Sequence, residues 1–342
     1  MRLFNYITVI CLGLLLVNCG ETNTSKQTGL SIDTNAKFIA LGDQLNLTIS
    51  NPKKKNIESV SYKLNDIDIK PNHTLKSISL GKNTIEAIVN YDGNSETLTK
   101  QIEVNNNRRP DIYTYEIVNT YPHDITSYTQ GLEFYKGELY ESTGQRTESK
   151  LRKLNFETGE VLMNTDLADA FFGEGLTIFN DSIYQLTWQN KRGFIYDVNS
   201  FKRLGIFNYG QSAEGWGLCN DGTQLYKSDG TEKIWFLNKD NLTENGHIEV
   251  YTEKGKIPSL NELEWIEGKI YANIYQRNGV VIINPENGAV EGVIDFKPLR
   301  KMVTQHAKLD VLNGIAFNPE RNTIFVTGKN WDKLFEVRIK KK

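Results

Sequence analysis

The stretch FGEGLTIFNDSIYQLTW, residues 172–188, decides the fold of this 342-residue chain. Glu174 stands between two glycines, and an apolar strand at 176–179 follows it. A turn at 180–182 leads into a second strand at 183–188, which runs back along the first. Glycine allows another backbone to approach closely, so the pattern suits a carboxylate presented at the mouth of a strand. Taken alone, however, Gly-Glu-Gly is more often an ordinary turn with a solvated acid.

The same pattern occurs five times, which changes the interpretation. Its copies begin at Gln130, Glu174, Trp216, Asn261 and Asn313, with steps of 44, 42, 45 and 52 residues. Each copy continues through a turn into a second strand, and several add a third. A period of about 40–50 residues made only of short strands is the signature of a β-propeller with one four-stranded blade per repeat. The sequence therefore predicts an all-β protein with a five-bladed β-propeller.

The ends of the repeat region predict how the ring closes. The last repeat supplies three strands, at 314–317, 323–327 and 333–339, and a spare strand at 113–118 precedes the first repeat. An open ring would leave exposed strand edges. We expect the spare strand to pair into the last blade as its outermost strand.

The residues that begin the five repeats predict a functional site. Equivalent repeat positions lie at equivalent radii, so these residues should surround one end of the central channel. Small or apolar side chains are expected near an axis, yet four of the five are polar and the fifth is Trp216. We expect Glu174 and the nearby aromatic residues to contact a ligand, together with the three carboxamides at repeat starts, Gln130, Asn261 and Asn313. Enclosure by aromatic rings should raise the pKa of Glu174, so that it can both take and return a proton. We expect Trp235, Trp265 and Trp331 to be core residues.

Composition and motif searches exclude several function classes. The net charge of −2 gives no reason to expect nucleic acid as a partner. The four histidines show neither H-x-x-x-H nor H-E-x-x-H spacing, so a catalytic transition-metal centre is not expected. No G-x-S-x-G elbow and no P-loop occur.

The N-terminal region reads as an export signal. Arg2 precedes an apolar run at 7–17 that is too short to span a bilayer as a helix. The run ends in Leu16-Val17-Asn18-Cys19, which resembles a bacterial lipoprotein signal. The resemblance implies that residues 1–18 are a lipoprotein signal peptide and Cys19 is the lipid-modified residue, and we expect residues 19–29 to be a polar tether. This predicts a lipid-anchored protein of the bacterial cell envelope, on the periplasmic or outer-membrane face. The alternative is a plain secretory signal with an incidental cysteine.

Between the tether and the repeats, the pattern changes to alternating apolar residues. We expect residues 30–105 to form a small immunoglobulin-like β-sandwich, residues 106–111 a linker, and residues 112–342 the propeller with the catalytic site. Cys219 is expected to be a buried apolar residue without a disulfide partner.

Ten short stretches carry a resemblance to a known family. They lie at 128–132, 141–144, 173–177, 193–197, 215–218, 228–230, 260–264, 272–276, 311–316 and 325–329. In content and order they resemble the plant-type and bacterial glutaminyl-peptide cyclotransferases, the glutaminyl cyclases built on a five-bladed β-propeller. The resemblance covers about residues 112–339. It does not extend to the N-terminal sandwich.

The resemblance implies an aminoacyltransferase that converts the N-terminal glutamine of a peptide into pyroglutamate and releases ammonia. It implies that Glu174 is the general acid/base and that Lys329 lies near the substrate carbonyl, where it can stabilise negative charge on oxygen. The remaining residues implied or expected to bind substrate are Gln130, Trp188, Trp216, Asn261, Tyr275, Tyr128 and Asn313. Tyr275 stands where the family usually has Trp, and Tyr128 where it usually has Phe. Substrate preference is therefore in question at these two positions.

The resemblance also sets expectations for cofactors and partners. No cofactor or catalytic metal is implied, and a structural cation in the channel is left open. The expected partners are a peptide or protein with N-terminal glutamine and a membrane reached through Cys19, and we expect a monomer. Two alternatives stay open: a non-catalytic propeller that binds a peptide or sugar, and a propeller hydrolase with calcium on its axis. The hydrolase would want several acids in the ring, which offers Glu174 and, one place offset, Glu262.

Overall fold

The computed structural model describes residues 28–35 and 38–342. The expected signal peptide, Cys19 and nearly all of the tether therefore lie outside the described residues. The described part consists of β-strands β1–β30 and one short 3-10 helix, η1 (Leu299–Lys301), which confirms the all-β class. It contains no helix that is long and apolar enough to cross a membrane.

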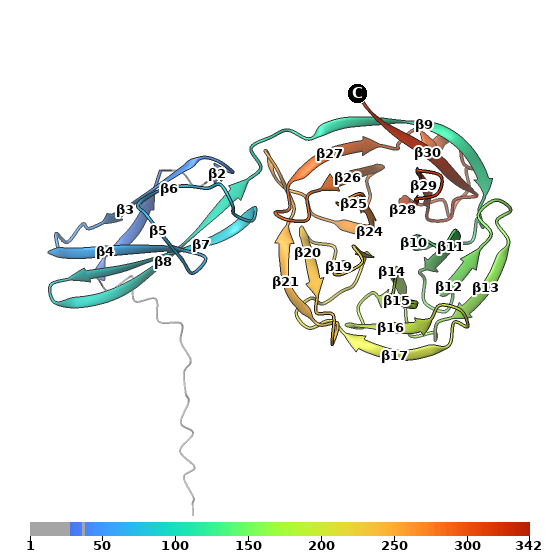
Figure 1. Cartoon of the computed structure of the whole chain (residues 1–342), viewed down its shortest axis with the longest axis horizontal. Coiled ribbons are helices and arrows are strands. Elements are labelled where there is room, and N and C mark those ends of the chain that lie inside the picture. Colours follow the sequence, from blue (N-terminus) through green and yellow to red (C-terminus); the bar gives the residue numbers. More distant parts are fainter. Residues whose placement is uncertain (1–27, 36–37) are drawn as a thin grey trace, which may run out of the picture.

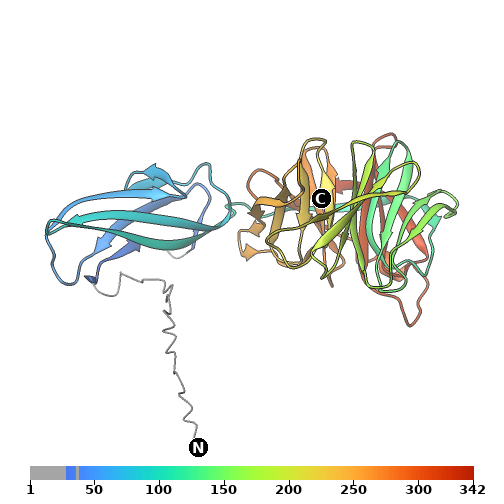
Figure 2. The same cartoon turned by 90° about the horizontal axis from the view of Figure 1, so that it is seen from below.

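The first eight strands form two sheets that lie beside the rest of the chain (Figures 1 and 2). The smaller sheet has the order β1 (Ser31–Thr34), β3 (Gln44–Ser50), β6 (Asn72–Thr74). The larger has the order β2 (Phe38–Ala40), β8 (Asn94–Asn105), β7 (Gly81–Tyr91), β4 (Ile57–Leu64), β5 (Ile67–Ile69). Every second residue of β7 is buried. Its apolar face, including Ile85 and Val89, packs with Leu45 and Leu47 of β3 in one core.

Three four-stranded antiparallel sheets follow the order of the chain. The first contains β10 (Thr129–Tyr135), β11 (Glu138–Thr143), β12 (Lys150–Leu154) and β13 (Val161–Asp166). The second contains β14 (Gly173–Phe179), β15 (Ser182–Thr187), β16 (Arg192–Asp197) and β17 (Arg203–Asn208). The third contains β18 (Leu218–Asn220), β19 (Leu225–Ser228), β20 (Lys233–Leu237) and β21 (Glu244–Glu249). The expected second strands of these repeats are confirmed to within one or two residues, whereas β14 begins three residues before the expected strand at 176–179.

An eight-stranded sheet completes the ring. Its order is β24 (Leu260–Ile266), β25 (Lys269–Ile274), β26 (Gly279–Ile283), β27 (Val290–Asp295), β9 (Asp111–Pro122), β30 (Lys333–Lys341), β29 (Thr323–Gly328), β28 (Leu312–Asn318). A separate small hairpin, β22 (Tyr251–Thr252) and β23 (Gly255–Lys256), lies between β21 and β24 in the chain. Strand β9 pairs antiparallel with β30, which confirms the expected role of the spare strand. It is longer than expected, and its first residues also pair in parallel with β27.

Strands β10, β14, β24 and β28 meet around a common centre (Figure 1). Strand β10 contacts β14 and β28, β14 contacts β18, β18 contacts β24, and β24 contacts β28. These five inner strands therefore form a closed ring of contacts.

The glycine that recurs in the repeats makes this close contact sterically feasible. A Cβ atom on Gly175 would lie 2.7 Å from Gly217 Cα, and one on Gly217 would lie 2.0 Å from Asn261 O. Both distances are shorter than real Cβ contacts, so any side chain would force the inner strands apart. The glycines thus bring the residues that precede them, Glu174 and Trp216, together around the axis.

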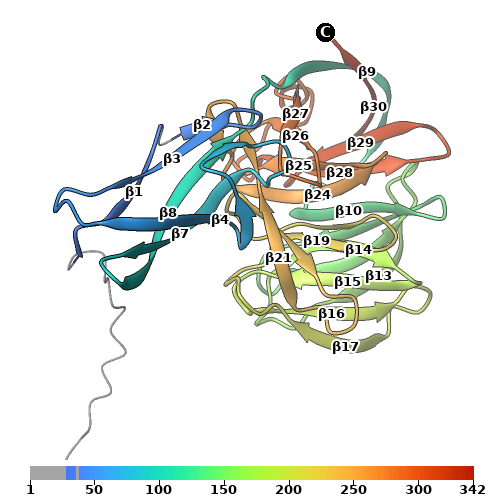
Figure 3. The same cartoon turned by 60° about the vertical axis from the view of Figure 1, so that its left-hand side comes forward.

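The two sheets of strands β1–β8 contact the ring at its outer rim (Figure 3). The Leu80 amide donates to Asn287 O at 3.0 Å, and the Lys82 amide donates to Glu249 Oε2 at 3.1 Å. Tyr251 of β22 packs into the core of the N-terminal sheets. On the ring side, Cys219 of β18 is buried and has no disulfide partner among the residues described, as expected.

Candidate active site

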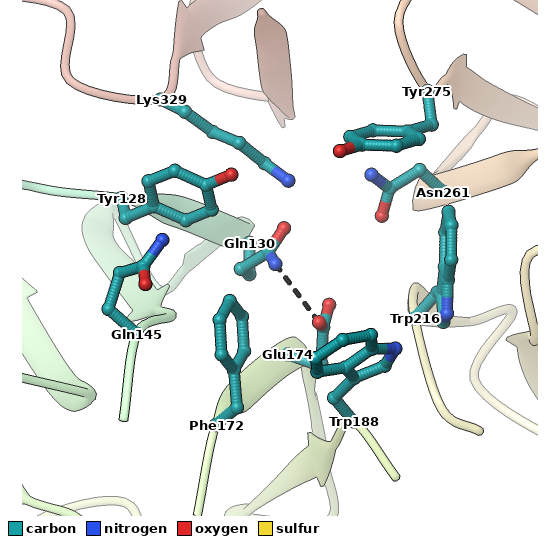
Figure 4. A pocket seen from close by; sticks show the side chains of 10 residues that line it. All are labelled: Tyr128, Gln130, Gln145, Phe172, Glu174, Trp188, Trp216, Asn261, Tyr275 and Lys329. Carbon is teal, nitrogen blue, oxygen red and sulfur yellow. Dashed lines mark hydrogen bonds between the residues drawn. The ribbon is translucent and has the colours of Figure 1, made fainter. Parts of the chain in front are cut away.

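A cavity of about 180 Å³ opens at one end of the inner strands (Figure 4). It contains every site residue expected within the described chain except Asn313. Two further residues, Gln145 and Phe172, were not expected. The lining residues are Tyr128, Gln130, Gln145, Phe172, Glu174, Trp188, Trp216, Asn261, Tyr275 and Lys329.

Glu174 is held in this cavity by one of its two oxygens. It is the second residue of β14 and only 4% exposed. Its Oε1 accepts a hydrogen bond from Gln130 Nε2 at 3.0 Å. Its Oε2 is buried and has no hydrogen-bond partner among the described residues. The carboxyl group is thus fixed in position while one oxygen stays available to a ligand.

Asn313 lies behind Gln130 and does not line the cavity. Its Nδ2 donates to Thr129 O at 3.0 Å and to Gln130 Oε1 at 3.1 Å. Because Gln130 Oε1 is thereby an acceptor, Gln130 Nε2 is the group that faces Glu174. The expectation that Asn313 contacts substrate is therefore not supported by its position. Asn313 shares the repeat position, but its side chain is fully buried between the inner strands, where it orients Gln130.

Aromatic rings form most of the cavity wall. Trp216 and Tyr275 pack edge to face with ring centroids 5.4 Å apart, and Phe172 packs against Trp188 at 5.5 Å. These rings leave the face that they turn to Glu174 largely apolar. The expectation that aromatic residues enclose the carboxylate is confirmed (Figure 4). Trp235 and Trp331 are buried in the core, also as expected.

Glu214 joins the two indoles and was not expected from the sequence. Its Oε2 accepts hydrogen bonds from Trp188 Nε1 and from Trp216 Nε1, each at 2.8 Å. One carboxylate thus sets the orientation of both rings. It lies two residues before Trp216, outside the repeat-start positions, so the repeat alignment carried no signal for it.

Burial and neighbouring charges act on the pKa of Glu174 in opposite directions. Desolvation raises this pKa well above its ordinary value and is the largest effect. The Lys329 charge lowers it, and the Glu214 charge raises it further. The net direction is upward, toward the range in which a carboxyl group can act as both base and acid near neutral pH.

Lys329 approaches the cavity from the opposite side. Its ammonium group lies 4.7 Å from the centre of the Tyr128 ring and 5.1 Å from that of Tyr275. No carboxylate pairs with it among the described residues. Burial lowers the pKa of Lys329, and the charge of Glu174 raises it. A cation between two aromatic faces, without a carboxylate of its own, is well placed to meet developing negative charge on a ligand.

Tyr128 and Tyr275, which stand where the family usually has Phe and Trp, keep their aromatic rings in the cavity wall. The hydroxyl of Tyr128 donates to Asp310 Oδ2 at 2.9 Å, so it is satisfied within the protein. Its pKa is raised, chiefly by burial and then by the bond to Asp310. Tyr128 therefore presents a ring rather than a free hydroxyl to the cavity.

Two lining residues were missed for different reasons. Phe172 stands two residues before Glu174, immediately before β14, so its nearness to the repeat position was a usable signal for it. Gln145 lies in a loop with a left-handed backbone conformation (φ 83°), outside the aligned repeats. Its position depends on the loop, which the pattern of strands does not predict.

The described residues hold no group of three or more His, Cys, Asp or Glu side chains arranged to bind a metal ion. Glu262, the second acid near the axis, does not line the cavity. Its carboxylate accepts hydrogen bonds from the backbone amides of Leu132 and Ile315 at 3.4 and 3.0 Å.

Comparisons with known proteins agree with this arrangement. A family model described as glutamine cyclotransferase matches residues 90–339. A glutaminyl-peptide cyclotransferase of Arabidopsis thaliana is 35% identical over 230 residues, which are 66% of this chain and 71% of the relative. The crystal structure of Myxococcus xanthus glutaminyl cyclase aligns with a TM-score of 0.64 at 36% identity, and covers 68% of this chain and 100% of its own. The chain therefore belongs to the glutamine cyclotransferase family.

Proposed function

We propose that this protein is a glutaminyl-peptide cyclotransferase, which converts the N-terminal glutamine of peptides into pyroglutamate and releases ammonia. The observation that carries the proposal is the Glu174 carboxyl group. It is buried in an aromatic cavity and keeps one oxygen without a partner among the described residues. The family match to residues 90–339 and the named relatives support the same reaction class.

The reaction needs proton management more than binding of a second substrate. The α-amine nitrogen attacks the γ-carboxamide carbon of the same residue. A five-membered lactam forms as the bond between that carbon and its amide nitrogen breaks and the nitrogen leaves as ammonia. Because the step is intramolecular, the enzyme gains rate by holding the glutamine in its folded conformation. A cavity of about 180 Å³ walled by rings suits one compact side chain.

Glu174 acts as the single general acid/base in this proposal. Its unpartnered Oε2 takes a proton from the α-amine during attack, and then delivers a proton to the departing nitrogen. A pKa raised by burial favours both steps, since the group must be able to gain and lose a proton near the working pH. The hydrogen bond from Gln130 Nε2 keeps Glu174 Oε1 occupied and the carboxyl group oriented, and Asn313 in turn holds the Gln130 amide in place.

Lys329 stabilises the negative charge that develops on the carbonyl oxygen in the tetrahedral intermediate. Pre-positioned donors of this kind contribute roughly 10²–10³-fold to rate. Trp188, Trp216, Phe172, Tyr128 and Tyr275 wall the substrate, while Gln130 and Asn261 supply amide groups. Asn261 Oδ1 has no partner within the described residues, so it can accept a hydrogen bond from the substrate amine or amide.

We further propose that the ring is a five-bladed β-propeller and that the two N-terminal sheets form an immunoglobulin-like sandwich. Supporting the propeller are the three four-stranded sheets, the closed contacts of the five inner strands, and an eight-stranded sheet that divides into two blades at β9. Supporting the sandwich is the shared core of its two sheets. The corresponding domains are residues 30–105 and 112–342, with the linker at 106–111. Limited proteolysis within 106–111 would check this boundary, and protection of that segment with cleavage elsewhere would move it.

We also propose a lipid anchor at Cys19 and a place in the bacterial cell envelope, which the sequence before the described residues supports. We propose separately that the protein acts as a monomer. Incorporation of labelled fatty acid in wild type but not in Cys19→Ser would support the anchor. Light scattering of the solubilised protein measures the oligomeric state.

Ammonia release from a glutamine-initiated dipeptide tests the function. The purified protein should release ammonia with excess chelator present, because no step above needs a metal ion. An N-acetylated dipeptide should be inert, since its amine cannot attack. If the folded protein releases no ammonia at any pH between about 5 and 9, the cyclotransferase assignment is wrong.

A further inference from the structure

A second and larger cavity adjoins the candidate active site. Its volume is about 880 Å³, and Tyr128 and Gln145 line both cavities. The other walls come from Thr143, Asn330 and residues of the segments at 125–127, 146–152 and 306–308. Cavities of about 300–1,000 Å³ typically enclose drug-sized ligands. We call this cavity the outer groove, and it has room for several residues of an extended peptide.

Positive charge predominates in the outer groove. Two of its cations are already paired: Arg152 with Asp124 at 2.8 Å, and Lys150 with Asp166 at 2.7 Å. Two others, Arg146 and Lys308, are exposed and have no carboxylate partner in the part of the chain that the structure describes. Glu148 is the single acid among the described residues that line the groove. The uncommitted charge of the groove is therefore positive.

Arg146 lies at the junction of the two cavities. Its guanidinium carbon is 5.8 Å from the centre of the Trp188 ring, which walls the active-site cavity. The flanking residues Gln145 and Thr147 both have left-handed backbone conformations, with φ of 83° and 70°. This conformation is rare for a β-branched residue, and such conformations persist where surrounding contacts enforce them.

The enforcing contacts connect the loop to the strand that carries Glu174. Ser149 Oγ donates to Gln145 O at 2.7 Å and accepts from the Gly173 amide at 2.9 Å. The loop is thus fixed relative to the catalytic carboxyl group, and Arg146 with it. A peptide whose first residue occupies the active-site cavity passes this cation as its chain enters the outer groove.

We propose that the outer groove is an extended substrate subsite that favours peptides with Asp or Glu shortly after the N-terminal glutamine. The inference rests on the proposed function and adds a substrate class to it. Arg146 and Lys308 attract the acidic side chain of the peptide. The fixed 145–149 loop sets the position of the groove relative to the cavity that holds Glu174.

The expected preference is modest and depends on salt. Exposed ion pairs contribute about 0.2–1 kcal/mol, which corresponds to about 1.4- to 5-fold in kcat/KM for each pair. The Debye length shortens from about 10 Å at 0.1 M salt to about 3 Å at 1 M, so high salt should largely remove the preference. A preference that came from packing rather than charge would persist in high salt.

The test compares C-terminally amidated pentapeptides that begin with glutamine. One series places a single Glu at each of positions two to five, and the reference peptide has Gln in place of that Glu. Free-acid versions of the reference peptide separate recognition of a side-chain acid from recognition of a terminal carboxylate. The measured quantity is the ratio of kcat/KM for the acidic peptide to that for the neutral peptide.

Wild type should prefer at least one acidic peptide at low salt. Lys308→Glu should lower the ratio about two- to tenfold, and Arg146→Gln should also lower it. Lys202→Glu makes the same charge change at an exposed site outside both cavities, and should leave the ratio unchanged. Equal turnover of acidic and neutral peptides, or a ratio unaffected by Lys308→Glu, would overturn the subsite while leaving the cyclotransferase intact. Absence of turnover with every glutamine peptide would instead reject the proposed function.

Discussion

Replacement of Glu174 by Gln isolates the proton-transfer role, because the two side chains have nearly the same shape. In the wild type, Oε1 accepts from Gln130 Nε2 at 3.0 Å, and the oxygen of a glutamine amide can accept the same hydrogen bond. The amide nitrogen then takes the place of Oε2, the atom proposed to move protons. The substrate cavity keeps its volume and loses only its base.

The expected loss of activity follows from that single change. General acid–base catalysis typically contributes 10²–10⁴-fold, so kcat/KM should fall by at least that factor. At about 1.36 kcal/mol per tenfold, this is about 2.7–5.4 kcal/mol of transition-state stabilisation. KM should change little, because the aromatic walls and the Gln130 contact remain.

Folding should survive the substitution. Because burial raises the pKa of Glu174 above its unfolded value, the wild type loses stability as pH rises from the unfolded toward the folded pKa. The glutamine variant has no such loss. Above that window it should therefore be at least as stable as wild type in thermal unfolding.

The assay is initial-rate ammonia release from a glutamine dipeptide amide, measured from about pH 5 to 9. Glu264→Gln is the matched control. Glu264 lies on β24 and is buried like Glu174, but it accepts a hydrogen bond from the Phe317 amide and does not line the cavity. It should keep near wild-type turnover. A Glu174→Gln variant with more than about a tenth of wild-type kcat/KM would refute the proton-transfer role.

Three further predictions concern neighbouring residues. Lys329→Ala should lower kcat about 10²–10³-fold. Because the Lys329 charge lowers the pKa of Glu174, the acidic limb of the kcat/KM profile should also move to higher pH in this variant. An unchanged rate would mean that Lys329 has only a structural role. Glu214→Gln keeps an acceptor for both indoles but removes a charge that raises the Glu174 pKa, so the acidic limb should move to lower pH, and a fixed limb would contradict this coupling. Burial raises the pKa of Glu133 from 4.5 to about 7, so wild-type stability should fall as pH rises between these values. Urea unfolding at pH 5 and 7.5 should show a smaller fall in Glu133→Gln. Equal falls in the two proteins would mean that Glu133 does not titrate in this range.

The repeat alone was enough to predict the all-β class, the pairing of the spare strand and four of the ten residues that line the cavity. Period-two alternation and turn residues are local properties, so the expected strands at 183–188 and 323–327 lie within a residue of the observed bounds of β15 and β29. The recurring position also predicted that Glu174, Gln130 and Asn261 would meet, because equivalent positions in a closed ring share a radius. The glycine after Glu174 is where this local signal has a steric basis, since only glycine lets the inner strands approach.

Side-chain direction and long-range partners were decided by the tertiary structure. Asn313 shares the repeat position, but its amide turns into the space between strands and bonds Thr129 and Gln130, which are distant in sequence. Glu214 orients two tryptophans from different repeats, and Gln145 reaches the cavity from a loop with left-handed backbone conformations. Sequence periodicity reports which face of a strand is buried. Which buried polar groups pair, and which one is left to meet a substrate, depends on contacts that form only when the ring closes.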